Sequence, residues 1–307
     1  MNLKSNFQFK VGMFLILTVL MLFASCAPQP AGEMGTEIIE ARDLARYLNQ
    51  PNAVLVDARN MPDYRESHIQ GAVNVSRADI VVMNPFPALL APAEQIERVM
   101  GSRGISNDSL VLIYDNNNNM DAARLWWTLK VYGHDNVKVV SGGFQALLAA
   151  GFQLSTTPPQ IQPAVFRAGP KREDMLVTAA EIRRNINEPN PSIVLLDTRS
   201  DDEWSEGFIP GAIHANYIGN NFRDGTFRPV THIRIRYLEL GVDYTKEVHL
   251  YCLTSIRATQ TFLAMYNAGY RNLRLYDGAW VEWSANPMNP IAVPEVPAGG
   301  LRRADQS

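Results

Sequence analysis

One segment of the chain occurs twice, and this internal repeat constrains the fold more than any other feature of the sequence. Residues 54–59 (VLVDAR) are matched by residues 194–199 (VLLDTR), and the same spacing then leads to a Gly-Ala pair in each copy. Later segments also correspond: residues 110–115 match 248–252, and residues 139–144 match 273–280. A chain of 307 residues has room for two domains. The repeat therefore predicts two tandem domains of one architecture.

Each copy alternates short, β-branched apolar runs with helical stretches. We expect buried strands at residues 54–56, 110–114 and 137–140 in the first copy, and at 193–196, 248–251 and 273–276 in the second. Helices are expected over 121–132 and 256–268, because a glycine follows each of them as a stop signal. Strands that alternate with helices predict α/β domains, each a mainly parallel sheet flanked by helices.

The first residues carry the signs of export. Lys4 and Lys10 precede an apolar run over residues 11–24, which suits a signal peptide and is short for a membrane span of about 20 residues. The run ends Ala-Ser-Cys26, which resembles a bacterial lipobox and predicts lipidation of Cys26. A cleaved signal peptide with an incidental cysteine and an uncleaved anchor are the alternatives. We expect a protein of the bacterial cell envelope, lipid-anchored to a membrane and facing the periplasm or exterior.

Proline-rich stretches and the repeat set the expected domain boundaries. These are a signal peptide over 1–25, a tether over 26–35, a first domain over 36–156, a linker over 157–172, a second domain over 173–294 and a tail over 295–307. A net charge of −3 gives no basic footprint for nucleic acid. The two cysteines lie at opposite ends of the chain, which excludes a disulfide-stapled fold. We expect neither a metal site nor a cofactor.

Several motifs together resemble the rhodanese family of sulfurtransferases, in its two-domain thiosulfate/3-mercaptopyruvate branch. The most specific is LYDGAWVEW at residues 275–283, and ARLWW at 123–127 and VSGGF at 140–144 match the first, non-catalytic domain of that branch. The resemblance covers about residues 36–292 and implies two rhodanese-like domains. It further implies transfer of sulfane sulfur from a small anionic donor, such as thiosulfate or 3-mercaptopyruvate, to a thiol or cyanide acceptor through a persulfide on Cys252.

Cys252 is the only cysteine after residue 26, and it follows a predicted buried strand just before a predicted helix. A loop in this place can turn backbone N–H groups toward the sulfur, and the helix N-terminus adds positive potential. Both effects favour the nucleophilic thiolate. Arg257 is expected to pair with an anionic donor or with the persulfide, and Thr254 and Ser255 are candidate substrate-binding residues of the same loop.

The first copy has Asp115 in the place of Cys252 and so lacks the sulfur carrier. We expect this domain to be structural, or to form one wall of the active cleft. The Asp-x-Arg motif occurs in both copies, as Asp57 and Arg59 and as Asp197 and Arg199. Because the copy without the cysteine keeps the motif, we interpret both motifs as structural ion pairs.

Two positions depart from the family pattern. Leu253 stands where many thiosulfate-type members have a cation, and Glu203 stands where the family has a further substrate arginine. A carboxylate there would repel an anionic donor. Two other functions therefore stay open. One is a catalytically idle, membrane-tethered binding module. The other is a Cys-dependent phosphatase or arsenate reductase, whose loop has one residue more between Cys and Arg than this chain has between Cys252 and Arg257.

Overall fold

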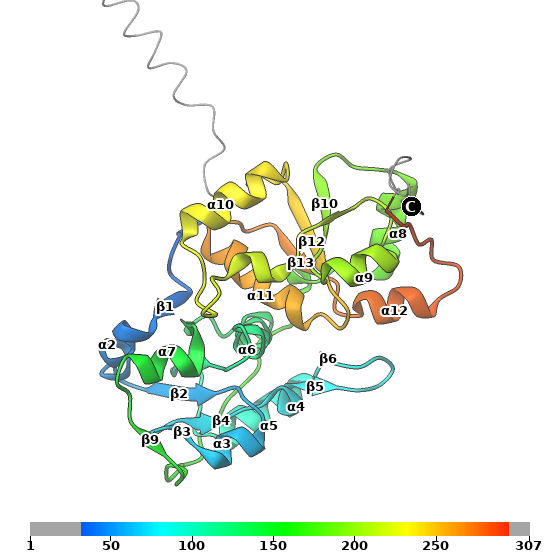
Figure 1. Cartoon of the computed structure of the whole chain (residues 1–307). Coiled ribbons are helices and arrows are strands. Elements are labelled where there is room, and N and C mark those ends of the chain that lie inside the picture. Colours follow the sequence, from blue (N-terminus) through cyan, green and yellow to red (C-terminus); the bar gives the residue numbers. More distant parts are fainter. Residues whose placement is uncertain (1–31, 295–307) are drawn as a thin grey trace, which may run out of the picture.

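The computed structural model describes residues 32–294, which form two α/β domains (Figure 1). The first domain contains a five-stranded sheet in the order β1-β8-β7-β2-β4, with every neighbouring pair parallel. Its strands are β1 (Ile38–Glu40), β2 (Ala53–Asp57), β4 (Val73–Asn74), β7 (Leu110–Tyr114) and β8 (Val137–Ser141). Two short antiparallel pairs accompany it: β3 (His68–Ile69) with β9 (Leu154–Ser155), and β5 (Val81–Val82) with β6 (Leu89–Leu90).

The second domain repeats this topology with a four-stranded parallel sheet in the order β11-β10-β12-β13. Its strands are β10 (Ile193–Asp197), β11 (Ala212–His214), β12 (Glu247–Tyr251) and β13 (Leu273–Leu275). A parallel bridge from Leu176 to Leu275 extends the sheet at the edge that corresponds to β1. The predicted fold class and the six predicted strands are confirmed. The strands could be predicted because strands covered by helices consist of apolar, β-branched runs.

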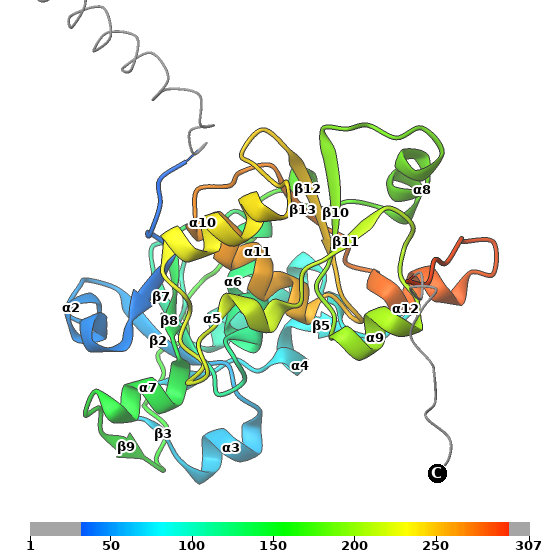
Figure 2. The ribbon, with the colours of Figure 1, turned by 45° about the horizontal axis from the view of Figure 1, so that its top comes forward.

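Helices cover both sheets, and the two longest of them meet between the domains (Figures 1 and 2). These are α6 (Met120–Val131) and α11 (Ile256–Asn267), which match the two predicted helices to within a residue at each end. The other helices of the first domain are α2 (Leu44–Leu48), α3 (Met61–Glu66), α4 (Arg77–Ile80), α5 (Ala93–Ser102), α7 (Gly143–Ala149) and the 3₁₀ turn η1 (Ala41–Asp43). Those of the second are α8 (Ala179–Asn187), α9 (Asp201–Glu206), α10 (Val230–Glu239), α12 (Ala279–Ala285), η2 (Glu173–Met175) and η3 (Tyr217–Asn220).

Apolar packing between α6 and α11 joins the domains into one core. Trp126 of α6 is fully buried, with its ring 6.2 Å from that of Phe262 and 5.4 Å from that of Tyr266 on α11. Trp127, the next residue of α6, is also fully buried. Phe166, from the predicted linker, is buried in the same cluster. Large aromatic side chains of this kind contribute most of the contact area, so we expect the domains to keep a fixed relative position.

The residues that precede the first domain in the sequence contact the second domain. In the predicted tether, the backbone N–H of Gly32 donates to the carbonyl of Gly269 at 3.2 Å, and that of Gly35 to the carbonyl of Asn267 at 2.8 Å. The predicted signal peptide, Cys26 and the predicted tail lie outside the described residues. Within residues 32–294, no helix is long and apolar enough to cross a membrane.

Candidate active site

Cys252 lies at the carboxyl end of β12, where the loop over residues 252–255 leads into α11. The loop is held from α12, because the backbone N–H groups of Trp280 and Val281 donate to the carbonyls of Cys252 and Leu253 at 2.9 and 3.2 Å. Cys252 is only 1% exposed, whereas Leu253 is 39% exposed at the loop surface. A slender group, such as the terminal sulfur of a donor, suits the approach to this cysteine.

Arg257, in the first turn of α11, forms a two-pronged ion pair with Glu203 of α9. Its Nη1 lies 2.5 Å from Oε2 of Glu203 and its Nη2 lies 2.7 Å from Oε1. Burial lowers the pKa of Arg257, but the bonds to Glu203 and the nearby Cys252 sulfur outweigh this and raise it. Burial raises the pKa of Glu203, but Arg257 and Ser200 outweigh it and lower that pKa to about 2. Both side chains are therefore charged at neutral pH.

Ser255 ends the loop in a left-handed conformation, with φ at +66°, and is the residue just before the first turn of α11. Its Oγ accepts from Nη1 of Arg124 at 3.0 Å and lies 3.0 Å from Oδ1 of Asp277, to which it donates. The same Nη1 also donates to Oδ1 of Asp277 at 2.8 Å. Arg124 is fully buried and belongs to α6, so the first domain reaches directly into the catalytic loop.

Asp277 ties a further part of the first domain to this network. Its Oδ2 accepts from the backbone N–H of Leu90 in β6 at 2.7 Å, while Nη2 of Arg124 donates to the carbonyl of Ala88 at 2.9 Å. The β5–β6 hairpin extends beneath the second domain in Figure 1. Ser255 is fully buried, and its hydroxyl is used within this network. The Ser255 side chain thus positions the loop, and the expected contact of Ser255 with substrate stays a prediction.

Asp115 occupies the place in the first domain that Cys252 has in the second. Its Oδ1 accepts from the backbone N–H groups of Asn117 and Asn119 at 3.0 and 3.1 Å, and its Oδ2 from those of Asp121 and Ala122 at 2.8 and 3.0 Å. Burial, with the charge of Asp121, raises the pKa of Asp115 to about 6 against these four donors. A loop between strand and helix thus holds an anionic group with backbone N–H groups alone.

The two Asp-x-Arg motifs form buried ion pairs in the structure. Arg59 donates from Nε and Nη2 to Asp57, with the Nη2 contact at 2.7 Å, and also to the carbonyl of Ser67. Arg199 repeats this with Asp197 at 2.6 Å. The guanidinium of Arg199 lies 4.2 Å above the ring of Trp280, next to the catalytic loop. Each pair stabilises the turn that follows a strand. The N–H donors named here are bonded within the protein and do not point into a cavity unpaired.

A cavity of about 850 Å³ opens beside the catalytic loop. It lies at the carboxyl edge of the first domain's sheet and reaches the second domain at Thr254. Apolar side chains (Met61, Pro62, Val81, Met83 and Pro87) and polar ones (Ser76, Arg77, Asn116, Asn117 and Asp121) line it. The volume is that of an ordinary small-molecule site. Thr254 is thus the predicted substrate-binding residue that faces a cavity.

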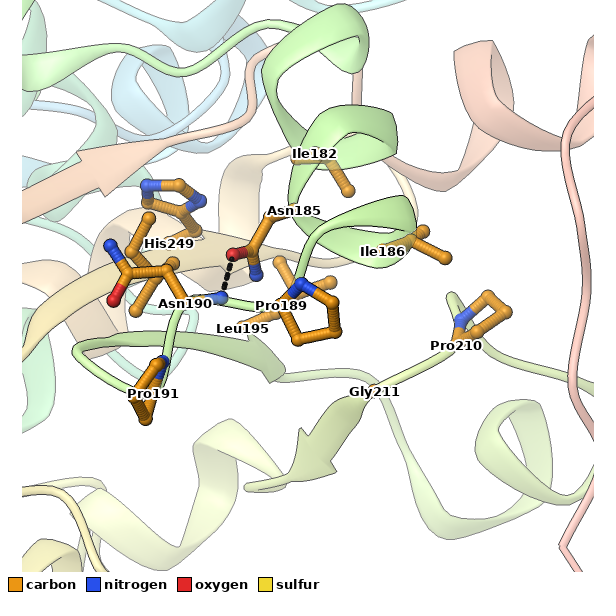
Figure 3. A pocket seen from close by; sticks show the side chains of 11 residues that line it. Ile182, Asn185, Ile186, Pro189, Asn190, Pro191, Leu195, Pro210, Gly211 and His249 are labelled. Carbon is orange, nitrogen blue, oxygen red and sulfur yellow. Dashed lines mark hydrogen bonds between the residues drawn. The ribbon is translucent and has the colours of Figure 1, made fainter.

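A second cavity, shown in Figure 3, lies on the other side of the second domain. Ile182, Ile186, Pro191 and Leu195 give it an apolar lining, with His249 at its edge. Nε2 of His249 lies 2.6 Å from Oε1 of Glu247, and burial lowers the pKa of His249 despite this partner. His249 therefore points away from the catalytic loop, in agreement with its position three residues before Cys252 in a strand.

The profile of the Rhodanese-like domain matches two segments of the chain, residues 40–150 and 178–286. The chain belongs to the rhodanese family. The first segment contains Asp115 and α6, and the second contains Cys252 and α11. Both domains of this rhodanese are therefore members of one family, in agreement with the internal repeat.

Among proteins similar to this rhodanese is a putative thiosulfate sulfurtransferase 1 of Mycobacterium bovis. It is 30% identical, and the match covers 80% of this chain and 93% of that protein. A probable 3-mercaptopyruvate sulfurtransferase of Pseudomonas aeruginosa is 29% identical, over 83% of this chain and 98% of that one. The solved structure of SseA from Escherichia coli has a TM-score of 0.73 at 24% identity, covering 80% of this chain and 99% of that chain. This last likeness establishes the fold.

Two residues at the site of this rhodanese had no role in the sequence analysis. Arg124 and Asp277 stand within the ARLWW and YDGAW motifs, but the motifs alone do not indicate that the two side chains meet across the domains. One signal was available: Arg124 is the charged residue in a segment, residues 122–127, that is otherwise apolar. A charge in such a place requires a buried partner.

Proposed function

We propose that this rhodanese carries sulfane sulfur as a persulfide on Cys252 and passes it to a thiophilic acceptor. The chain is a sulfurtransferase of the thiosulfate/3-mercaptopyruvate type. Relatives that it matches over most of their length carry these names. The single observation that carries the persulfide proposal is the position of Cys252. It is the only cysteine after residue 26, and it sits between a buried strand and the N-terminus of a 12-residue helix.

The reaction proceeds by two exchanges at sulfur. In the first, the Cys252 thiolate attacks the outer sulfur of the donor. A new S–S bond forms, and the bond from that sulfur to its carrier breaks, with the electron pair leaving on the carrier. In the second, an acceptor thiolate or cyanide attacks the outer sulfur of the Cys252 persulfide. The sulfur moves to the acceptor, and the electron pair of the broken S–S bond returns to Cys252 as thiolate. No external oxidant or reductant is required.

Asp115 supports the assignment of an anion-stabilising loop to the second domain. The two loops occupy corresponding places, and the first holds a carboxylate with four backbone N–H groups. The start of α11 adds the positive end of a helix dipole near Cys252. Because a persulfide is also a compact anion, the corresponding loop is suited to it. Thr254 connects that loop to a cavity large enough for the donor's carrier or the acceptor.

The two alternative functions fit the site less well. A phosphatase or arsenate reductase binds a tetrahedral oxyanion, and here Arg257 already holds the carboxylate of Glu203 while Cys252 is 1% exposed. An idle binding module would have no need for a cysteine at this loop.

A cyanide-acceptor assay that measures thiocyanate, with several sulfur donors, separates these functions. Wild type should turn over at least one donor and Cys252→Ser none, because a serine cannot form the S–S bond. Turnover by Cys252→Ser equal to wild type would contradict the persulfide route. Phosphate release from an aryl phosphate by wild type, without thiocyanate, would favour the phosphatase.

We also propose that Cys26 anchors the protein to a bacterial membrane through lipid. The support is the sequence alone: an apolar run that ends in Ala-Ser-Cys26. Two or more acyl chains give stable anchoring, whereas one chain holds weakly. Metabolic labelling with a tagged fatty acid should mark the wild-type protein and place it in the membrane fraction. Label that persists on Cys26→Ser would refute the proposal.

A further inference from the structure

Every arginine that the structure places at the catalytic loop or at its cavity has a carboxylate partner. Arg257 is paired with Glu203, and Arg124 with Asp277. Arg77, which lines the cavity, lies 2.6 Å from a carboxylate oxygen of Asp121. Arg59 is also a lining residue, and its guanidinium is bonded to Asp57. Within residues 32–294, each of these four arginines is therefore paired with a carboxylate, and the two charges of each pair cancel.

Glu203 is the partner that most directly affects a donor, because Arg257 is the cation next to Cys252. The carboxylate cannot swing aside without loss, since its Oε2 also accepts from the backbone N–H and the Oγ of Ser200 at 3.0 and 2.8 Å. These bonds form the capping box at the start of α9. Arg257 and Glu203 are both partly buried, at 19% and 26% side-chain exposure, so water screens the pair only in part.

Donor charge then has a direct consequence. A donor with a sulfonate or carboxylate beside the transferred sulfur must take Arg257 away from Glu203, which leaves one carboxylate unpaired next to a second negative group. A donor whose carrier is neutral brings only the reacting sulfur, which the loop receives through its backbone. The exposed apolar side chain of Leu253, in the same loop, also suits a carrier without charge.

We propose that Glu203 sets the donor specificity of this enzyme, so that it takes sulfur from an organic persulfide with an uncharged carrier in preference to thiosulfate or 3-mercaptopyruvate. This inference rests on the proposed function, in which Cys252 carries the sulfur. Glu203 is a specificity-determining residue that acts through Arg257.

The experiment compares kcat/KM for thiosulfate and for 2-hydroxyethyl persulfide in wild type and Glu203→Gln, with cyanide as acceptor and the enzyme-free rate of thiocyanate formation subtracted. Glutamine keeps the capping box with Ser200 and removes the charge. Wild type should prefer 2-hydroxyethyl persulfide by about tenfold or more, and Glu203→Gln should shift the ratio toward thiosulfate by about tenfold, the scale of one charge-assisted contact. Glu206→Gln is the matched control, because Glu206 is an exposed residue of the same helix. It should leave the ratio as in wild type.

The outcomes separate the specificity from the function. If wild type uses thiosulfate as well as 2-hydroxyethyl persulfide, or if Glu203→Gln leaves the ratio unchanged, the specificity inference is overturned while Cys252 remains the sulfur carrier. If neither donor gives turnover or places sulfur on Cys252, the proposed function itself fails. The wild-type comparison stands alone, so the inference can be refuted even if Glu203→Gln does not fold.

Discussion

Replacing Arg124 by methionine removes a side chain of α6 that hydrogen-bonds to the catalytic loop. Arg124 is fully buried and donates to Ser255, Asp277 and the carbonyl of Ala88. Breaking a buried ion pair from one side costs about 3–5 kcal/mol. Asp277 keeps the backbone N–H of Leu90 and the hydroxyl of Ser255 as donors, so the lower end applies. We expect the free energy of unfolding to fall by about 3 kcal/mol.

The effect on activity follows from the backbone of Ser255. A non-glycine residue in the left-handed region costs about 1–2 kcal/mol, and Arg124 helps to hold Ser255 there. When that bond is lost, the loop should leave its active conformation often enough to lower kcat/KM by about tenfold. Glycine adopts this conformation without strain. Ser255→Gly in the Arg124→Met background should therefore restore most of the lost activity but not the lost stability.

Two measurements check this reasoning: denaturant unfolding, and sulfur transfer with a competent donor. Arg172→Met is the control, because Arg172 pairs with Asp135 at the surface, where an ion pair is worth about 0–1 kcal/mol. It should change neither quantity by much. If Ser255→Gly recovers no activity in the Arg124→Met protein, Arg124 acts only through the stability of the domain interface. If Arg124→Met keeps full activity, the loop does not depend on the first domain.

Three further predictions concern charge. Asp115→Ala should leave sulfur-transfer turnover within a few-fold of wild type, and a loss of several orders of magnitude in a folded protein would count against an inert first domain. Because folding raises the pKa of Asp115 from 3.8 to about 6, the unfolded chain loses the Asp115 proton at a lower pH than the folded protein does. Relative to Asp115→Asn, wild type should therefore lose stability as pH rises from about 4 to about 6, as denaturant midpoints at several pH values would reveal. Since the pKa of Glu203 is lowered from 4.5 to about 2, its pairing with Arg257 is fully present above about pH 4.5 and is lost as pH falls through about 2. Between about pH 5 and pH 8, the ratio of kcat/KM for thiosulfate between wild type and Glu203→Gln should therefore stay constant, and a change of that ratio in this window would contradict a permanently charged Glu203.

The internal repeat predicted most of the fold because the central strands of both sheets are short and largely buried, which gives them a strong local pattern. Residues 110–114, for example, are five consecutive buried residues in β7. Cys252 could also be located, since the loop between a buried strand and a helix is a local feature. The bridge from Leu176 to Leu275 at the edge of the second sheet could not be predicted, because a single bridged residue requires no run of apolar residues in the sequence.

The pairings at the site could not be predicted in the same way. Glu203 and Arg257 are 54 residues apart, and Arg124 and Asp277 are 153 apart. Whether such side chains meet depends on how α6 and α11 cross and on the direction of α9, which sequence spacing does not specify. From the sequence alone, Glu203 was expected to repel a donor and Arg257 to attract one. The structure joins the two, so their charges largely cancel before any donor arrives.

The most direct test of the central proposal is the intact mass of the protein after incubation with a competent sulfur donor. Wild type should gain about 32 Da, the mass of one sulfur atom, and the gain should disappear when cyanide or a thiol acceptor is added. Peptide mapping should place the added sulfur on Cys252, and Cys252→Ser should show no gain. A protein that turns over donor while its mass stays unchanged, or one that carries the sulfur in the Cys252→Ser variant, would contradict a persulfide on Cys252.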